Sequence, residues 1–427
     1  MVQNEIDWDA ANAELASHGR GGIDAKTARR SSDPRRSAKR DSAGWVNDIG
    51  DPPPGIAKET LSPEILDQLR LSSITGVGPR IMATLLERFG SASEVFRGDT
   101  DAIVSVPGIG PKLYNEIKLE SRGYDLDAVV HWCMNHDTQI LVKDQSPYPT
   151  MLDDLVDAPP ILFCRGELLP EDDIAVAIVG TRHATSYGLK QAERIAYSLA
   201  RAGVTVVSGL ARGIDAAAHE GALSGGGRTI AVLGGGLAQM YPPEHGGLAK
   251  AIAADGAVLS EHPPMTKTKG GLFPQRNRIV AGLSMATLVI EAPDRSGSLI
   301  TARLAGEQNR EVMSLPGPVS SRVSRGCNQL IRDGATLVQS VDDILEALGP
   351  MRSPVETSDG NQVHRPSELK LNEIERKVLD AIETTSTSID QVIQTCELPT
   401  HQVIAIISVL EMKRLVQRMS GQNVCRI

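Results

Sequence analysis

The chain is poor in aromatic side chains, which make up only 3% of its 427 residues. Phenylalanine occurs 4 times, tryptophan 3 times and tyrosine 6 times. Cores therefore have to be built from alanine, valine, isoleucine and leucine, the other side chains that are most often buried. The length suffices for roughly two to four domains. An aromatic ring in a loop of such a chain is a candidate for function.

Long hydrophobic runs and paired cysteines are also missing. No apolar stretch approaches the roughly 20 residues that span a bilayer, and the acidic first residues carry no apolar signal region. We therefore expect a cytoplasmic protein without membrane insertion. The five scattered cysteines contain no C-x-x-C pair, which indicates free thiols in a reducing compartment. The net charge of −9 provides no overall attraction to nucleic acid, so such binding has to depend on local basic patches.

Motifs of several enzyme classes are absent. The sequence has no G-x-x-x-x-G-K-[ST] loop, and no G-x-G-x-x-G follows the first core strand, which argues against P-loop ATPases and dinucleotide enzymes. His131, Cys133 and His136 lack a second pair of metal ligands. Asp215 and His219 share a helix face and could act as acid and base, but we favour Asp215 as a helix cap. We expect no catalytic residue, no metal and no cofactor.

Short β-branched runs alternate with helical patterns over residues 174–348. Runs of this length, separated by helix-length segments, predict βαβ units and a parallel sheet that is covered on both faces. In such sheets ligands bind beyond the carboxyl ends of the strands. After the opening run at 174–179, the runs are residues 204–208, 229–233, 257–260, 286–290, 311–314 and 336–338.

The predicted carboxyl rim of this sheet is rich in glycine, small hydroxyl groups and cations. Glycine lets the backbone approach an anion, Thr181 offers N–H and hydroxyl donors, and an arginine fork matches phosphate geometry. A groove of cations beside a stacking ring, here Phe273, suits single-stranded nucleic acid. The candidate DNA-binding residues are Gly180, Thr181, Arg182, Ser208, Gly209, Arg212, Lys267, Lys269, Phe273, Arg276, Asn277, Arg278, Ser296 and Gly297.

A structural interpretation of the same residues stays open. In it, Phe273 packs beneath its loop, and Arg276 or Arg278 pairs with Glu261 or Glu291. We favour binding because both cation clusters fall on one rim of the predicted sheet.

Residues 1–122 predict two units that precede the sheet. Residues 1–60 form a polar arm with eight cations between Arg20 and Arg40. We expect a disordered, solvated arm, although contact with nucleic acid is the alternative.

Residues 61–122 carry a repeat of the helix-hairpin-helix form. Gly76-Val-Gly78-Pro79 is echoed by Gly108-Ile-Gly110-Pro111, and a helical pattern follows each copy. Backbone N–H groups at the start of the next helix could meet a phosphate. A helical packing domain that touches no DNA explains the repeat equally well.

Residues 123–427 are expected to form the sheet domain, a linker and a last domain. The sheet domain covers residues 123–348, with two short strands in 123–173 extending the edge of the sheet. Residues 349–368 have the composition of a linker. Residues 369–427 show three helical patterns and a hairpin, which predicts a winged helix. The third helix of this domain carries little charge, so contact with a protein explains it at least as well as binding of duplex DNA.

These motifs together resemble the DNA-processing protein A family, also called DprA or Smf. The resemblance covers roughly residues 61–427 and is densest at 179–182, 208–215, 273–284, 295–302 and 324–334. It implies an α/β protein with an extended Rossmann-like domain between a small helical helix-hairpin-helix (SAM-like) domain and a winged helix. It also implies a non-catalytic homodimer that binds and protects incoming single-stranded DNA and loads RecA during natural transformation.

The resemblance also assigns site residues. The phosphate-binding motif of the family corresponds to Gly180, Thr181 and Arg182, and its lysine and aromatic residue correspond to Lys269, with Lys267 as the alternative, and to Phe273. Where the family has Tyr-Pro-x-x-Asn, this chain has Tyr241-Pro-Pro-Glu-His245, so the role of that position stays open.

Two other functions remain possible on the sequence alone. One is a nucleotide-processing Rossmann hydrolase that uses the glycine-rich loops at 234–236 and 296–298. The other is a regulator whose Rossmann-like domain senses a metabolite while the winged helix binds an operator. The residues that would contact RecA or a second subunit carry no motif.

Overall fold

The computed structural model describes residues 61–74, 76–120, 126–348, 355–356, 362–419 and 421–427. The expected arm at residues 1–60 and most of the expected linker lie outside the described residues. Among those that are described, no helix combines the length and the apolar character needed to cross a membrane. The cysteines all lie in this part of the chain and are free thiols, four of them buried.

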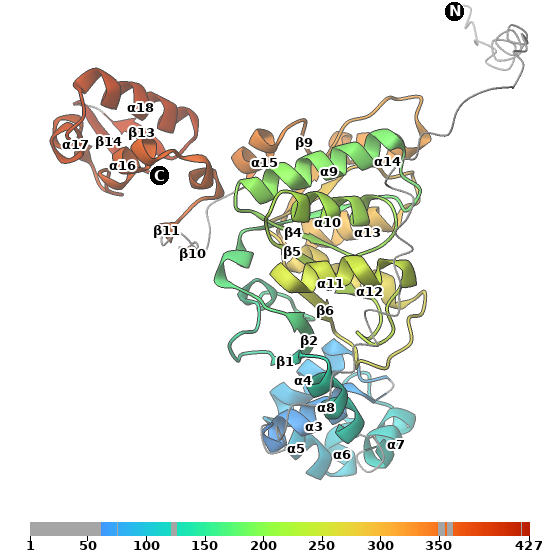
Figure 1. Cartoon of the computed structure of the whole chain (residues 1–427). Coiled ribbons are helices and arrows are strands. Elements are labelled where there is room, and N and C mark those ends of the chain that lie inside the picture. The colour runs from blue at the N-terminus through green and yellow to red at the C-terminus, as the bar shows by residue number, and fades with distance from the viewer. Residues whose placement is uncertain (1–60, 75, 121–125, 349–354, 357–361, 420) are drawn as a thin grey trace, which may run out of the picture. The chain divides into compact units, whose positions relative to one another are not determined.

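A nine-stranded sheet in the order β1-β2-β6-β5-β4-β3-β7-β8-β9 occupies the middle of the described chain (Figure 1). Neighbouring strands from β6 to β9 are parallel, whereas β2 runs antiparallel to β6 and β1 antiparallel to β2. The predicted parallel sheet with two added edge strands is confirmed. The strands are β1 (Thr138–Val142), β2 (Ile161–Gly166), β3 (Ala175–Val179), β4 (Thr205–Ser208), β5 (Thr229–Leu233), β6 (Ala257–Ser260), β7 (Ala286–Val289), β8 (Glu311–Ser314) and β9 (Thr336–Leu337).

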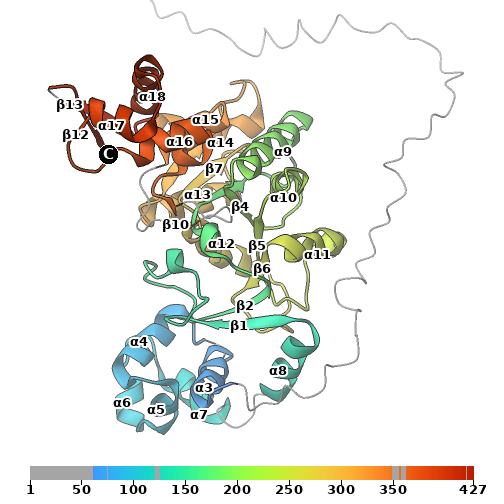
Figure 2. The same ribbon diagram turned by 60° about the vertical axis from the view of Figure 1, so that its left-hand side comes forward.

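Side chains of the central strand β3 alternate between two cores on opposite faces of the sheet. In β3, Val176 and Ile178 pack into one core, whereas Ala175, Ala177 and Val179 pack into the other, as the period of two in a strand requires. Helices α9, α10 and α11 lie along one face, and α12 and α13 along the other (Figure 2). The helices of this domain are α9 (Ser186–Arg201), α10 (Ile214–Ser224), α11 (Gly246–Asp255), α12 (Leu272–Gly282), α13 (Gly297–Glu307), α14 (Arg325–Arg332) and α15 (Val341–Ala347).

The strand order reverses between β3 and β7. Strands β4, β5 and β6 follow β3 on one side, whereas β7, β8 and β9 lie on the other. At such a reversal the loops that leave the two central strands diverge and open a crevice at the carboxyl edge. The loop after β3 begins at Gly180 and the loop after β7 at Ile290, so both contribute to this crevice.

The repeat in residues 61–122 folds into two hairpins that pack on each other. A Cβ on Gly76 (φ +102°) would lie 3.1 Å from Leu113 of α7, which is a tight contact. A Cβ on Gly108 (φ +91°) would lie 3.6 Å from Ile81 of α4, at ordinary van der Waals distance. Each hairpin therefore favours glycine for its positive φ and lies in contact with the helix that follows the other hairpin. The helices are α3 (Pro63–Ser72), α4 (Pro79–Phe89), α5 (Ala92–Arg97), α6 (Thr100–Val104) and α7 (Pro111–Glu120).

Helix α3 also belongs to a core that includes the edge of the sheet. Its Leu69 packs in one cluster with Trp132 of α8 (Leu126–Asn135) and with Phe163 of β2. The helical unit is thus joined to the sheet through apolar packing.

The predicted winged helix is confirmed. It contains α16 (Glu373–Asp380), α17 (Ile389–Cys396) and α18 (Thr400–Met412), followed by β13 (Val416–Met419) and β14 (Asn423–Arg426). A two-residue strand, β12 (Thr387–Ser388), completes a three-stranded sheet in the order β12-β14-β13. In the stretch expected to be linker, β10 (Val355–Glu356) pairs with β11 (Gln362–Val363), so the described part of that stretch holds a small ladder.

Candidate nucleic-acid interface

A pocket of about 530 Å³ occupies the crevice at the carboxyl ends of β3 and β7. Four segments that are distant in the sequence line it, and they come from the loops after β3, β4 and β7 and from the start of α12. This crevice brings together most of the residues predicted from the sequence, namely Gly180, Thr181, Arg182, Gly209, Phe273, Arg276, Asn277, Ser296 and Gly297.

The first wall of the crevice is the turn of Gly180, Thr181 and Arg182. A Cβ on Gly180 would lie 2.5 Å from Ile214 Cγ1, so the turn packs on α10 only with glycine at this position. The Thr181 N–H donates to the Glu291 carbonyl at 2.7 Å, and only the Thr181 hydroxyl remains as a donor for a ligand. Arg182 is exposed, which leaves its guanidinium accessible from the crevice.

The second wall is the ring of Phe273, in the first turn of α12. It is half-buried, and one side rests on Gly234, where a Cβ would come within 2.9 Å of the ring. The guanidinium carbon of Arg182 lies 4.9 Å from the ring centre, within the range of a cation–π interaction. The ring of Tyr241 is tilted by 53° to that of Phe273, with 5.7 Å between the ring centres.

The glycines at 234–236 pack against residues 263–273, the loop that carries Lys267 and Lys269 and is called the cationic loop below. Cβ atoms on Gly235 and Gly236 would come within 2.3 Å of Thr268 Oγ1 and 2.1 Å of the Pro263 carbonyl oxygen. These glycines therefore serve close packing of residues 263–273, and this use accounts for them without a nucleotide phosphate.

The cations around Phe273 divide into exposed and buried pairs. Lys267 and Lys269 are exposed, whereas Arg276 and Arg278 are only 5% and 6% exposed. Arg278 donates to both carboxylate oxygens of Glu261 at 2.7 Å, as the structural interpretation of the sequence expected. Arg276 donates from Nη1 to the Val232 carbonyl at 2.7 Å and forms part of the crevice wall.

Arg276 shares its buried environment with Asp215. Burial raises the pKa of Asp215, an effect that the charge of Arg276 opposes. Burial lowers the pKa of Arg276 to about 10, so this arginine stays cationic at neutral pH. A Cβ on Gly209 would lie 1.8 Å from Arg276 Nη1, and the guanidinium therefore packs directly on the loop after β4. The pair connects this loop to α12 beneath the crevice.

The expected helix cap at Asp215 is wrong. Helix α10 begins after Gly213, which makes no side-chain cap, and Asp215 lies in its first turn. The Asp215 carboxylate accepts instead from the Ala211 N–H at 3.4 Å. Its partner in the acid–base hypothesis, His219, is fully buried 2.7 Å from the Thr229 hydroxyl, and burial lowers the pKa of His219 to about 3. The contacts of Asp215 and His219 are therefore with groups of the protein itself, as in a structural role.

Three further predicted residues lie near the crevice without lining it. Ser208 is buried, and its hydroxyl donates to the Ile178 carbonyl at 2.6 Å. Arg212 is exposed and paired with Glu244. Arg278 supports the cationic loop through Glu261.

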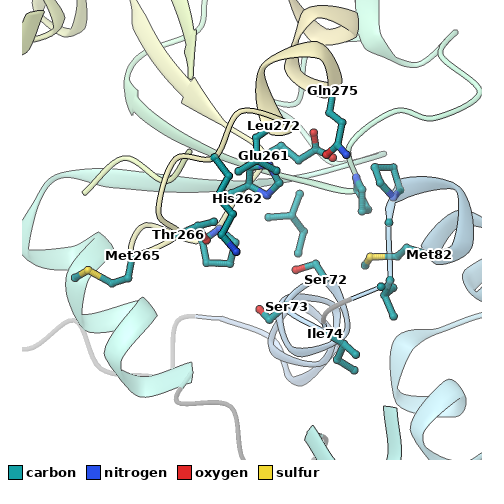
Figure 3. Close-up of a pocket in the computed structure, with 18 of the residues that line it drawn as sticks. Ser72, Ser73, Ile74, Met82, Glu261, His262, Met265, Thr266, Leu272 and Gln275 are labelled. Carbon is teal, nitrogen blue, oxygen red and sulfur yellow. The ribbon is translucent and has the colours of Figure 1, made fainter. Parts of the chain in front are cut away.

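The exposed lysines border another pocket, of about 780 Å³, where the cationic loop faces the first hairpin. Figure 3 shows Ser72, Ser73 and Ile74 on one wall and His262 and Thr266 on the other. Lys267 and Lys269 both belong to its lining. The hairpin and the cationic loop thus share one cavity.

The sequence reasoning missed two exposed residues of this region. Arg295 lines the crevice after β7, and Tyr241 contacts Phe273 from the loop after β5. Their position after a strand of a parallel sheet was the available signal. For Tyr241, the scarcity of aromatic residues was a second signal.

Comparison with known proteins agrees with this architecture. Residues 139–349 match the model of DNA recombination-mediator protein A, residues 362–422 match a DprA winged helix domain, and residues 69–122 match a SAM-like helix-hairpin-helix tandem. Protein Smf of Synechocystis is 34% identical over 387 residues, which are 83% of this chain and 97% of that protein.

Two further comparisons concern a streptococcal protein. DNA processing protein DprA of Streptococcus pneumoniae is 44% identical over 198 residues, covering 46% of this chain and 70% of that protein. The crystal structure of DNA processing protein A from the same organism aligns with a TM-score of 0.58 and 34% identity, over 68% of this chain and 99% of that chain. By sequence and by fold, the chain belongs to the DNA recombination-mediator protein A family, whose members are also called DprA or Smf.

Proposed function

We propose that this protein is a recombination mediator that binds single-stranded DNA along the crevice and catalyses no reaction. The observation that carries the proposal is the Arg182 guanidinium stacked 4.9 Å from the Phe273 ring centre, at the reversal of strand order. In sites of this kind cations bind the phosphates and an aromatic ring contacts the bases, without reading their sequence.

The proposal divides the predicted residues into two groups. Arg182, Phe273 and the two exposed lysines contact DNA directly, together with the Gly180 backbone, the Thr181 hydroxyl, and Ser296 and Gly297 at the start of α13. Asn277 holds the start of α13 through the Gly297 carbonyl at 3.3 Å. The residues that position this surface from beneath are Ser208, Gly209, Arg276 and Arg278.

Family membership supports the cellular part of the proposal. A mediator of this family would protect incoming single strands and load RecA onto them during natural transformation, as a homodimer in the cytoplasm. Arg212 joins the direct contacts in this scheme, because it is exposed at the same rim.

Two features weigh against the hydrolase alternative. The glycines at 234–236 are accounted for by packing against the cationic loop, and Asp215 and His219 are buried. The regulator alternative requires a basic recognition helix, whereas exposed residues of α18 include Ile404 and Met412. An apolar surface of this kind suits a protein partner better than a duplex.

The substitution Arg182→Ala tests the site. Because alanine cannot pair with a phosphate, we expect about tenfold weaker binding of single-stranded DNA. The slope of log affinity against log salt should fall by about 0.7. Fluorescence anisotropy with labelled oligonucleotides of several sequences, titrated with salt, measures both quantities on the full chain.

Arg201→Ala is the matched control. Arg201 is exposed at the end of α9, a helix of 16 residues that begins at the crevice, so it lies roughly 24 Å farther along that helix. The control should bind like the unaltered protein. Equal affinity of the two variants, with both folded, would contradict the site assignment.

A further inference from the structure

The exposed ring of Tyr241 lies between the Arg212 guanidinium and the ring of Phe273. It is 40% exposed, with the Phe273 ring centre at 5.7 Å and the Arg212 guanidinium carbon at 5.8 Å from its own ring centre. Since Arg182 stacks on Phe273, the four side chains form a series of cation, ring, ring and cation. Half of this series lies outside the crevice.

A separate pocket of about 390 Å³ borders Tyr241 on the side of the cationic loop. Its lining includes Tyr241, Pro243 and Lys267. The pocket therefore offers an aromatic face, an exposed ammonium group and enough space for a planar base. These are the components of a nucleotide subsite on a single strand.

Arg212 is paired with an anionic group, the carboxylate of Glu244. Its Nε donates to Glu244 Oε1 at 2.5 Å, and the two side chains are 49% and 50% exposed. A carboxylate and a phosphate present the same charge sign and the same kind of acceptor to a guanidinium. Exposed ion pairs contribute little to stability, so a phosphate can replace the carboxylate at small cost.

We propose that Tyr241 and Arg212 form a second nucleotide subsite, in which a base stacks on Tyr241 and Arg212 binds the neighbouring phosphate in place of Glu244. In the absence of DNA, Glu244 occupies the phosphate position. This inference rests on the proposed function and extends the path of the strand from the crevice towards Lys267.

Stacking on Tyr241 is tested with two oligonucleotides of equal length, one of thymidines and one with abasic sites throughout. Tyr241→Ala should weaken binding of the thymidine oligonucleotide about tenfold, because alanine offers no ring on which a base can stack. Binding of the abasic oligonucleotide should change less than about twofold, and Tyr241→Phe should retain binding of both, since the ring is kept.

The role of Glu244 is tested by Glu244→Gln, which removes the competing charge and keeps the shape of the side chain. We expect about threefold tighter binding of the thymidine oligonucleotide and a steeper salt dependence, because Arg212 is then free for a phosphate. The matched control is Glu193→Gln, which removes an exposed carboxylate from α9. It should leave affinity within about twofold of the unaltered protein.

The outcomes separate the inference from the proposed function. If the unaltered protein binds no single-stranded DNA, the proposed function fails and the subsite fails with it. Suppose that the unaltered protein binds the thymidine oligonucleotide and that Arg182→Ala weakens this binding. If Tyr241→Ala then binds the oligonucleotide with normal affinity, only the subsite is overturned. Equal weakening of thymidine and abasic binding in Tyr241→Ala would also overturn it, because the loss would then be structural. A Glu244→Gln variant no tighter than Glu193→Gln would overturn the phosphate role.

Discussion

Arg276 and Arg278 are buried to a similar extent but bind different partners. Arg278 forms a two-bonded pair with Glu261, whereas Arg276 donates to a carbonyl and faces Asp215. Both guanidinium groups are almost buried and engaged by groups of the protein itself. Removing one partner of such a buried pair leaves the other charge uncompensated. Variants of Arg276 or Arg278 would therefore lose stability as well as binding, and Arg182 is the cleaner probe of DNA contact.

His219 provides a pH-dependent prediction at the residue scale. Its pKa in the folded protein is lowered to about 3 from the ordinary 6.5. Between these pH values the unfolded chain binds a proton that the native protein does not bind, so stability falls as the pH is lowered through this window. At pH 5 the expected loss is about 2 kcal/mol.

Urea unfolding of the full chain at pH 7 and pH 5 measures this effect. In His219→Asn, which keeps a polar group near Thr229, the loss of stability between the two pH values should be smaller by about 2 kcal/mol. Asp215, whose pKa is raised by burial, shifts stability in the opposite direction in both proteins and cancels in the comparison. The same pH dependence in both proteins would contradict the assignment to His219.

The burial of these side chains could not be predicted from the sequence. The spacing of Asp215 and His219 correctly places both on one face of α10. Whether that face meets solvent depends on the packing of α10 against α9, β4 and β5. Tyr241 is the opposite example, an exposed side chain that the sequence did not single out. Its place beside the proposed site depends on contacts with Phe273 and Arg212, which lie far from it in the sequence.

At the scale of elements, the paired hairpins give a prediction with a control in the same unit. Gly76 has φ of +102° and touches Leu113, whereas Gly110 has open space around its Cβ position. Gly76→Ala should destabilise the helical unit by about 2 kcal/mol, because alanine is strained at positive φ. Gly110→Ala should have a much smaller effect.

Hydrogen exchange of amides in α4 and α7 of the full chain measures this destabilisation locally. The amides of both helices should exchange faster in Gly76→Ala, since the hairpin of one supports the helix of the other. Equal exchange in the two variants would mean that the reciprocal packing does not stabilise the unit.

The strands of the central sheet were predicted well for a physical reason. Strands β5, β6 and β8 have the bounds expected from the sequence, because strands covered on both faces appear as continuous apolar runs. The two-residue strands β10, β11 and β12 were missed. Two residues carry no periodicity, and their pairing is decided by distant partners.

At the scale of the whole molecule, a net charge of −9 opposes DNA binding. The proposed site overcomes this charge locally through Lys267, Lys269, Arg182 and Arg212, which are all exposed. Binding should therefore be strongly salt-dependent, because each phosphate that these cations neutralise releases counterions from the DNA.

The double variant Lys267→Ala/Lys269→Ala tests this local compensation. The slope of log affinity against log salt should fall by about 0.7 for each phosphate that the variant no longer neutralises. Stability should hardly change, because both side chains are exposed. Anisotropy titrations at several salt concentrations measure the slope.

The matched control for the lysine pair is Arg201→Ala/Arg332→Ala, which removes two exposed cations from the ends of α9 and α14. If both double variants lowered the slope equally, binding would follow total charge and the cationic loop would have no special role.

The location of the binding residues at one edge of the sheet has a practical consequence. Every residue that we assign to DNA contact follows the carboxyl end of a strand or begins the next helix, whereas the turn at residues 202–204 leads into the amino end of β4. A fluorophore or an affinity tag attached at this turn would lie at the amino edge of the sheet, opposite the edge that is proposed to bind DNA. Such a labelled protein could be immobilised for single-molecule experiments while its DNA-binding edge stays free.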